Sequence, residues 1–264
     1  MKPSPRLAAG LNIWPSYKAR DFSEQVRNLF NDRAEAWGRN YKPQGKLTWR
    51  LHQFCSVLGE FASPPAEVLD FGCGTGHLAK HLGEHHYVLT ACDLADQMIR
   101  TARRVFGETD IKWTTLPADW RQLPFVDRSF DAVVASSVLE YVGNLELVFS
   151  ELARVLRDGG VLIFNVPNPK NGQRKREDWA KRMTRRAWIR RALCTIPRIQ
   201  RYLTYLGLSN NRFPLGEWER GASRHGFQRM HAGHRPANRP LFLFAFQKNA
   251  LTEHIGQRQA GSPV

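Results

Sequence analysis

The stretch VLDFGCGTGHL, from Val68 to Leu78, decides the fold class of this sequence. An apolar run ends in an acidic residue, three glycines follow at alternate positions, and the next residues can open a helix. Glycine allows backbone turns that other residues cannot make and lets a ligand come close to the main chain. A strand that passes through such a turn into a helix is typical of the ligand site of a doubly wound α/β sheet, at the carboxyl end of a strand.

The residues around this turn alternate between short apolar runs and amphipathic segments. The runs predict strands at 67–71, 87–92, 111–116, 130–136 and 161–166. Helical spacing of apolar residues predicts helices at 77–83, 95–106 and 144–156. This β-α-β-α order predicts a mostly parallel sheet with helices on both faces.

Further elements lie outside this alternation. Apolar residues at helical spacing predict a helical leader at 21–37 and 46–61. One more helix is expected at 214–227. Two closing strands, at 227–235 and 241–248, can pair as a hairpin at the edge of the sheet.

The net charge of +15 is confined to the C-terminal part of the sequence. Residues 1–169 contain 19 basic and 19 acidic residues, whereas residues 170–264 contain 20 basic and 5 acidic ones. This asymmetry indicates that the two parts meet different partners. No apolar run is long enough for a signal peptide or for the roughly 20 residues of a membrane span. The four cysteines are far apart in the sequence, which favours free thiols and a cytoplasmic protein.

The glycine turn does not fit a dinucleotide site. The pattern G-x-G-x-x-G would need a third glycine where the chain has His77, and Asp70 would repel a pyrophosphate. An acid at this position suits a cofactor with positive charge. Asp93 ends the second strand, where an acid can accept hydrogen bonds from ribose hydroxyls. Asp119, with Trp120 beside it, follows the third strand and can hold an adenine, so the three acids predict an adenosine site without phosphate.

Four segments in this order resemble the successive motifs of the class I, Rossmann-like S-adenosylmethionine-dependent methyltransferases. They read VLDFGCGTG, ACDLADQMI, LPADWRQLPFVDRSFDAVVASSVLEYV and ELARVLRDGGVLIFNVPNP, and they cover about residues 66–168. The sequence is most similar to the small-molecule branch that includes the ubiquinone and menaquinone biosynthesis methyltransferases. The resemblance implies S-adenosyl-L-methionine as cofactor and a seven-stranded, mostly parallel sheet with an antiparallel edge hairpin.

The resemblance also implies roles for individual residues. The glycine turn would contact the methionine part of the cofactor, Asp93 the ribose, and Asp119 with Trp120 the adenine. The predicted cofactor residues are Asp70, Gly72, Gly74, Thr75, Gly76, Asp93, Leu94, Asp119, Trp120 and Ser136. A fainter similarity at FNDRAEAWGRNY matches a leader helix that lies over the cofactor in this branch. We therefore expect a leader or lid at 1–65, a methyltransferase domain at 66–250 and a flexible tail at 251–264.

Tyr141, in the segment LEYV, is the candidate catalytic residue, at a position where related sequences often read LEHV. A tyrosine with a normal pKa near 10 is a poor base at neutral pH. Tyr141 therefore either positions the acceptor, or the base comes from elsewhere, or no base is needed. The alternative is that Tyr141 only packs at the start of a helix.

Residues 167–212 interrupt the alternation and are expected to form a basic helical cap after the fifth strand. The segment 174–201 contains eleven basic and two acidic residues, and 185–196 has an amphipathic pattern. One interpretation is a solvated basic face on a packed helix. A second is an acceptor site for a small or lipid-linked anionic molecule, and a third is peripheral contact with the acidic inner face of a membrane. The predicted substrate residues are Tyr41, Arg185, Arg186 and Arg190.

The sequence supports two other functions and a metal site less well. The basic C-terminal part would suit a nucleic-acid methyltransferase, but no N/D-P-P-Y/F follows the fourth strand and no RNA-binding module is recognisable. A non-catalytic binding protein with a decayed domain conflicts with the intact acids of the three strand ends. His77 and His81 are four residues apart but have no carboxylate at suitable spacing, so the sequence predicts no metal site. It indicates no oligomeric state.

Overall fold

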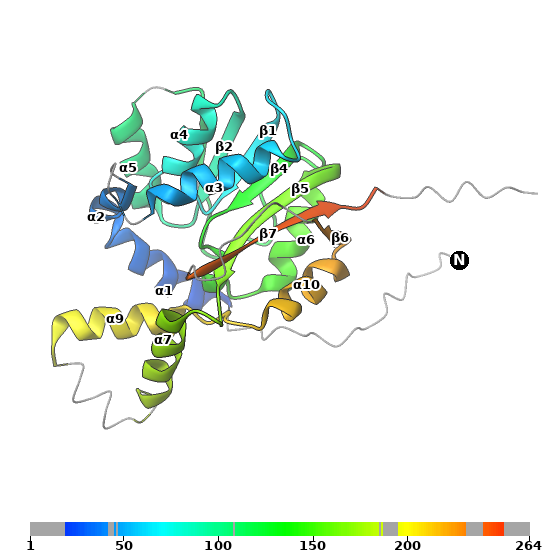
Figure 1. Cartoon of the computed structure of the whole chain (residues 1–264). Helices are drawn as coiled ribbons and strands as arrows, with labels where there is room; N and C mark the ends of the chain where they lie inside the picture. The colour runs from blue at the N-terminus through cyan, green and yellow to red at the C-terminus, as the bar shows by residue number, and fades with distance from the viewer. Residues whose placement is uncertain are drawn as a thin grey trace, which may run out of the picture.

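The computed structural model describes residues 19–41, 45, 47–107, 109–184, 186, 195–230 and 240–250. Within these residues the chain forms a seven-stranded sheet with the order β3-β2-β1-β4-β5-β7-β6 (Figure 1). The strands are β1 Glu67–Phe71, β2 Val88–Asp93, β3 Lys112–Thr115, β4 Phe130–Ala135, β5 Leu156–Pro167, β6 Phe227–Arg229 and β7 Leu241–Lys248. Strands β1 to β5 run parallel, and β7 runs antiparallel to both β5 and β6. The predicted α/β class and the antiparallel edge are thus confirmed.

Helices cover both faces of the sheet because its central strands are apolar on both sides (Figure 1). On one face α3 (Thr48–Gly59) and α4 (His77–Glu84) pack on the sheet through a core that includes Phe54 and Leu82, with α5 (Asp96–Phe106) beside them. On the other face α6 (Leu145–Val155) and α10 (Leu215–Arg224) pack around Phe149 and Trp218. This arrangement leaves the carboxyl ends of the parallel strands uncovered by these helices.

The leader departs from the single helix expected at 21–37. It forms α1 (Ala19–Asn31), then α2 (Ala34–Trp37) and a 3-10 turn, η1 (Gly38–Tyr41). The break has a physical reason in Asn31, whose side chain donates to Asp96 at 2.9 Å and accepts from the backbone of Gln97 at 3.0 Å. Asn31 thereby caps the start of α5, so the leader is tied to the helix that follows the second strand.

The junction between α6 and β5 also differs from the expected turn at RDGG. The helix ends at Val155, and the strand begins at once with Leu156. The pairing of β4 with β5 shifts its register between Phe130 and Ala132, which absorbs the extra residues as a bulge.

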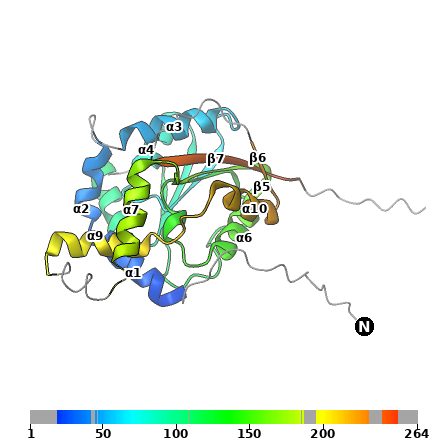
Figure 2. The ribbon, with the colours of Figure 1, turned by 60° about the horizontal axis from the view of Figure 1, so that its bottom comes forward.

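The segment after β5 forms α7 (Gly172–Met183) and α9 (Pro197–Leu208). These helices project from the sheet, and α9 lies beside both α7 and α1 (Figure 2). The amphipathic helix expected at 185–196 falls almost entirely outside the described residues, as does the tail at 251–264. None of the described helices combines the length and the apolar character that a membrane span requires.

Candidate cofactor and acceptor site

A cavity lies at the carboxyl ends of β1, β2 and β4, under the leader. It collects ten of the residues predicted from the sequence, which are Tyr41, Asp70, Gly72, Gly74, Asp93, Leu94, Asp119, Trp120, Ser136 and Tyr141. The strand order explains this convergence, because neighbouring parallel strands bring their carboxyl ends to one edge of a sheet. Residues more than 100 positions apart in the sequence thus line one space.

The glycine turn is tightly packed from behind. Gly72 has φ +73°, and a Cβ there would lie 2.4 Å from Cγ2 of Val138. Gly76 has φ +76°, and a Cβ there would lie 2.4 Å from the Trp113 ring. Both positions therefore need glycine, for conformation and for space. Gly76 and its neighbour Thr75 are absent from the cavity lining, so among the described residues their contact with a cofactor stays a prediction.

Asp70 lies at the bottom of the cavity with only 1% of its surface exposed. Neither of its carboxyl oxygens has a hydrogen-bond partner among the described residues. Burial, together with the nearby charge of Asp93, raises the pKa of Asp70 to about 8, and the backbone N–H of Ala79 in α4 only partly opposes this rise. A buried acid without a partner is costly in a folded chain. This arrangement fits a cationic ligand group that arrives from outside the protein.

Asp93 shapes the turn as well as the cavity. Its Oδ2 accepts from the backbone N–H of Gly74, and its Oδ1 accepts from that of Ala95, both at 2.8 Å. Each carboxylate oxygen keeps a second lone pair, so Asp93 can still accept from a ligand. Desolvation raises the pKa of Asp93, and the two backbone donors oppose that rise.

The loop that carries Asp119 and Trp120 is held by α6. Glu151 accepts from the backbone N–H of Leu123 at 2.7 Å, and Arg154 donates to the carbonyl of Leu123 at 3.0 Å. Trp120 packs edge-to-face on Phe71 with ring centroids 6.2 Å apart. Asp119 is exposed at the cavity rim.

The turn after β4 contains residues that sequence reasoning missed. Ser137 has φ +60°, and its backbone N–H donates to Asn165 Oδ1 at 2.6 Å. From the leader, Arg50 donates to the hydroxyl of Ser137 at 2.9 Å. The Nε of Arg50 is buried without a hydrogen-bond partner among the described residues. These contacts join positions 28 and 87 residues apart, and no local pattern marks them.

The leader closes the cavity from above. Tyr41 stacks on His77 with ring centroids 4.7 Å apart and planes inclined by 15°. His77 in turn contacts Thr75, with Nδ1 and Oγ1 3.0 Å apart. The residue that breaks the dinucleotide pattern thus supports the leader. Trp37 lines the cavity beside Gly74, where an added Cβ would lie 3.5 Å from the indole nitrogen.

Tyr141 lies in a 3-10 turn, η2 (Leu139–Tyr141), between the cavity and the inserted helices. Its ring packs edge-to-face on Phe30 and contacts Tyr205. Burial, followed by the charge of Glu140, raises the pKa of Tyr141 well above its usual value. The phenol therefore stays protonated at neutral pH, where it can donate a hydrogen bond but cannot act as a base.

The comparison with known proteins agrees with this geometry. Residues 69–164 match the family described as "Methyltransferase domain". The match begins in β1 and ends in β5, so it contains the glycine turn, Asp93, Asp119 and Tyr141.

Residues 69–164 form a class I S-adenosylmethionine-dependent methyltransferase domain.

The names of the curated relatives of this chain contain different acceptors. The chain is 29% identical over 160 residues to the malonyl-[acyl-carrier protein] O-methyltransferase of Legionella pneumophila, which covers 60% of this chain and 55% of that protein. It is 34% identical over 143 residues to the demethylmenaquinone methyltransferase of Tropheryma whipplei, which covers 53% of this chain and 57% of that protein. The chain thus spans little more than half the length of either relative.

Solved structures show that the fold is shared beyond recognisable sequence similarity. Magnesium protoporphyrin IX methyltransferase from Synechocystis, solved with bound S-adenosylhomocysteine, is 17% identical with a TM-score of 0.59, and the match covers 85% of this chain and 98% of that one. Phosphoethanolamine N-methyltransferase 2 from Haemonchus contortus, in complex with S-adenosylmethionine, is 18% identical with a TM-score of 0.53, and it covers 80% and 44%.

The residues that line the cavity fit the family's cofactor, S-adenosylmethionine. The unpartnered carboxyl of Asp70 suits the positive charge of the methionine part. The predicted substrate residues are less well placed. Arg186 is exposed after the end of α7, away from the cavity lining, while Arg185 and Arg190 lie outside the described residues.

Proposed function

We propose that this chain transfers the methyl group of S-adenosylmethionine to a small acceptor that carries an anionic group, free or linked to a lipid or carrier. The observation that carries the proposal is an acidic side chain and a basic side chain beside different parts of one cavity. Asp70 lies unpartnered at its bottom, and the guanidinium of Arg50 reaches its wall through Ser137. The acid suits the cationic cofactor, and the arginine suits an acceptor of opposite charge.

The cofactor half of the cavity supports one orientation of the ligand. In this orientation Asp70 pairs with the ammonium of the methionine part, and Asp93 accepts from the ribose hydroxyls. Leu94 and Trp120 would enclose the adenine, and Asp119 at the rim would accept from its amino group. This orientation is supported by the order of these groups along the strand ends. The carboxyl groups of Asp70 and Asp93 come first, then the apolar side chains, then the exposed Asp119.

The acceptor half is bounded by the leader, the turn after β4 and Tyr141. Arg50 is half-buried, which lowers the pKa of its guanidinium but leaves it charged at any physiological pH. Tyr41 and Glu140 interact electrostatically with the guanidinium and oppose this lowering of its pKa. The Nε of Arg50 has no hydrogen-bond partner among the described residues. An acceptor carboxylate or phosphate would supply that partner. Malonyl-carrier methylation by one relative is consistent with an acidic acceptor, because a malonyl thioester carries a free carboxylate.

Methyl transfer from this cofactor depends more on the alignment of the acceptor with the methyl group than on proton transfer. S-Adenosylmethionine supplies a methyl group on a positively charged sulfur, which is already a strong electrophile. The chain's own contribution is to exclude water with the leader and to hold the acceptor in line, and such positioning can supply much of a rate enhancement. Tyr141 fits this scheme as a donor that orients the acceptor. A carboxylate acceptor needs no base, because it is deprotonated at neutral pH.

A panel of acceptors with labelled S-adenosylmethionine tests the proposal. Malonyl thioester on a carrier represents an anionic acceptor, and demethylmenaquinone represents a neutral lipid one. We expect label in the anionic acceptor and, in Arg50→Met, a KM for that acceptor at least tenfold higher, with S-adenosylhomocysteine affinity unchanged. Arg39→Met is the matched control, because Arg39 is an exposed leader arginine outside the cavity lining. Turnover of the quinone alone, with no response to Arg50→Met, would contradict the proposal.

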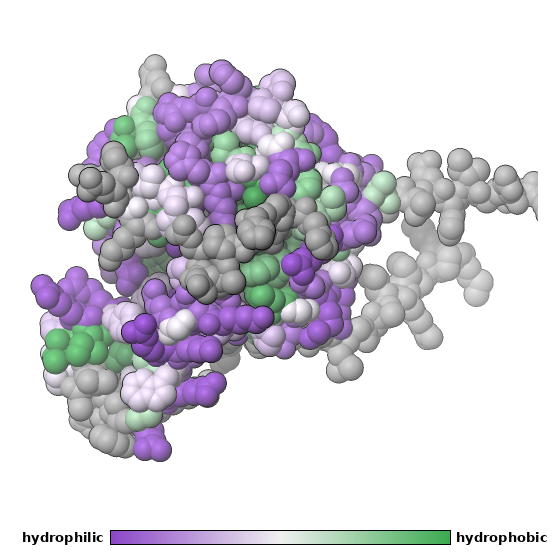
Figure 3. Space-filling view, in the orientation of Figure 1, coloured by the Kyte–Doolittle hydropathy of each residue, from purple (hydrophilic) through white to green (hydrophobic). Residues whose placement is uncertain are grey.

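We further propose that the outer surface of the insertion approaches an acidic lipid surface when the acceptor is lipid-linked. Hydrophilic side chains cover α7, and a hydrophobic patch lies at the outer end of α9 (Figure 3). Trp179, on α7 among the basic residues of that helix, is 64% exposed, and Ile196, directly before α9, is 50% exposed. Exposed Trp and Ile next to basic residues suit a membrane interface. Trp179→Ala should weaken binding to vesicles rich in acidic lipid, and equal binding to neutral vesicles would oppose this part of the proposal.

A further inference from the structure

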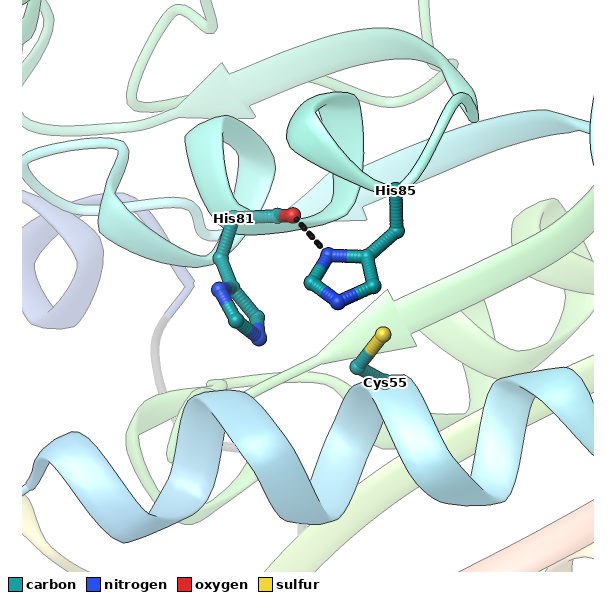
Figure 4. A group of neighbouring side chains, drawn as sticks. All are labelled: Cys55, His81 and His85. Carbon is teal, nitrogen blue, oxygen red and sulfur yellow. Dashed lines mark hydrogen bonds between the residues drawn. The ribbon is translucent and has the colours of Figure 1, made fainter.

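Three potential metal ligands meet on the side of the molecule where α3 packs against α4. Cys55 projects from α3 and His81 from α4, while His85 directly follows the last residue of α4 (Figure 4). The Cys55 sulfur and one ring nitrogen of each histidine all lie within 4.8 Å of one another. None of these three side chains lines the cofactor cavity. The sequence pointed to His77 and His81 as the nearest histidine pair, but His77 stacks on Tyr41 instead.

We propose that Cys55, His81 and His85 form a binding site for a zinc-type transition-metal ion that joins α3 to α4. A thiolate and two imidazoles are a donor set that zinc prefers, whereas magnesium and calcium prefer oxygen ligands. Binding replaces the thiol proton of Cys55 with the ion, and the proton passes to solvent. The fourth position of a tetrahedral ion is left for water or for a further donor.

The ring of His85 is already oriented for this role. Its Nδ1 donates to the carbonyl oxygen of His81 at 2.8 Å, as Figure 4 shows. A carbonyl oxygen can only accept, so Nδ1 carries a proton, and in the neutral ring the Nε2 lone pair is then left for a metal ion. Metal-binding histidines are usually held in this way, by a backbone carbonyl on the nitrogen that does not bind the ion.

His81 contributes an unsatisfied atom. Its Nε2 is buried and has no hydrogen-bond partner among the described residues. Buried polar atoms of this kind usually have a partner, and a metal ion would be one. The ring is also in edge-to-face contact with His52 of α3, with centroids 5.0 Å apart, so His52 is a further potential ligand beside the cluster.

The distances are compatible with binding after a small movement. Zinc-to-ligand distances of about 2.0 to 2.3 Å place the ligand atoms of a tetrahedral site about 3.5 Å apart. The separations here are within 4.8 Å, so the side chains would close by about 1 Å. Cys55 and His81 are half-buried and His85 is exposed, which leaves an entry path from solvent.

An ion at this place would act on the leader. α4 starts directly after Gly76 of the glycine turn, and α3 carries Arg50, which bonds to Ser137 at the cavity wall. A metal bridge between the two helices would therefore fix the position of Arg50 relative to the cofactor turn. Its first measurable effect is on stability, because an ion that binds only the folded chain raises the melting temperature.

Cobalt titration of the metal-free full chain tests the site without use of enzyme activity. We expect about one equivalent of Co²⁺ to produce a thiolate-to-cobalt charge-transfer band that Zn²⁺ then displaces, with a rise in melting temperature in Zn²⁺. Cys55→Ser should abolish the band, and His85→Asn should weaken Co²⁺ affinity about 100-fold, as expected for loss of one ligand of a tight site.

Two control variants separate the site from general metal binding. Cys92→Ala removes a buried cysteine outside the cluster, and His86→Asn removes an exposed histidine next to it at a position with positive φ, which Asn tolerates. Both should keep the band and the affinity. Circular dichroism without metal establishes that each variant is folded. Absence of the band in the intact protein, or its persistence in Cys55→Ser, would overturn the proposal.

Discussion

The cofactor cavity and the base of the inserted helices both bury acidic side chains, but only one of them leaves an acid without a partner. In the cavity, Asp70 is buried with no hydrogen-bond partner among the described residues. Under the insertion, Glu140 accepts from the Ser209 hydroxyl at 2.6 Å, and Glu177 is paired with Arg174 at 2.8 Å and with Arg212 at 3.0 Å. A buried acid without a partner indicates a ligand site, whereas a paired one indicates a structural joint.

The joint attaches the insertion to the turn that carries Tyr141. The Asn211 amide donates to the carbonyls of Leu139 and Val142, both at 2.7 Å. These residues flank Tyr141. The inner edge of the insertion thus holds this turn in place.

The largest effect that separates the two regions is expected at Asp93. Asp93→Asn removes a charged acceptor for two ribose hydroxyls, so S-adenosylhomocysteine affinity should fall at least about 100-fold. Asp110→Asn, at an exposed acid before β3, is the control and should leave affinity unchanged. Isothermal titration calorimetry measures both. Equal affinity in the two variants would remove Asp93 from the cofactor site.

Two glycine substitutions sharpen the comparison within the cofactor region. Gly72→Ala places a methyl group 2.4 Å from Val138 at φ +73° and should lower the free energy of unfolding by about 2–3 kcal/mol. Gly83→Ala in α4, where nothing lies within 4 Å of the new methyl group, should raise it by up to about 1 kcal/mol. Urea denaturation gives both values. A destabilising Gly83→Ala as large as Gly72→Ala would show that the packing argument is wrong.

For a contact in the structural joint we expect a loss of stability with unchanged cofactor affinity, which is the opposite of the result expected in the cavity. Ser209→Ala removes the donor to buried Glu140 and should cost about 1–3 kcal/mol of unfolding free energy. Its S-adenosylhomocysteine affinity should stay within twofold of the unmodified protein, because no cofactor residue is touched. Thermal melts and calorimetry on the same samples compare the two readouts, and a large loss of affinity with unchanged stability would reverse the assignment.

The protonation of Asp70 predicts that the affinity for the cofactor depends on pH. Its pKa of about 8 in the free protein means that the carboxyl is mostly neutral at pH 7. A cationic ligand needs the charged form, so affinity should rise about tenfold per pH unit below pH 7 and level off above about pH 8. Binding should also release a proton, seen as a buffer-dependent enthalpy. Asp70→Asn should flatten the profile, and a flat profile in the unmodified protein would contradict an ammonium partner.

The smallest effect is expected at Tyr141. Because the raised pKa keeps its phenol protonated, Tyr141→Phe should remove one orienting hydrogen bond and lower kcat by about threefold to tenfold. The pH profile of kcat should keep its shape. A lost basic limb in the variant would instead identify Tyr141 as an acid–base group.

Local sequence pattern was sufficient for the strands and for the order of the acids along them. The strand at 67–71 and the closing strand at 241–248 have the predicted bounds, because apolar runs between turn residues fix them locally. The same holds for the convergence of Asp70, Asp93 and Asp119, which follows from strand order alone.

Long-range contacts limited the remaining predictions. Arg50, Ser137 and Asn165 come from three elements and meet only in the fold. The break in the leader depends on Asn31 capping a helix that begins 65 residues later. Cys55 and His81 face each other across two helices, whereas the sequence shows them 26 positions apart. No periodicity or motif encodes such pairs.

A crystal structure of the complex with S-adenosylhomocysteine tests the central claim most directly, which is that the unpaired acid beneath the glycine turn holds the positive end of the cofactor. The account predicts the amino group of the ligand at the Asp70 carboxyl, its ribose on Asp93 and its adenine beside Trp120. A nucleoside bound elsewhere, or one in the cavity with its amino group turned away from Asp70, would contradict it.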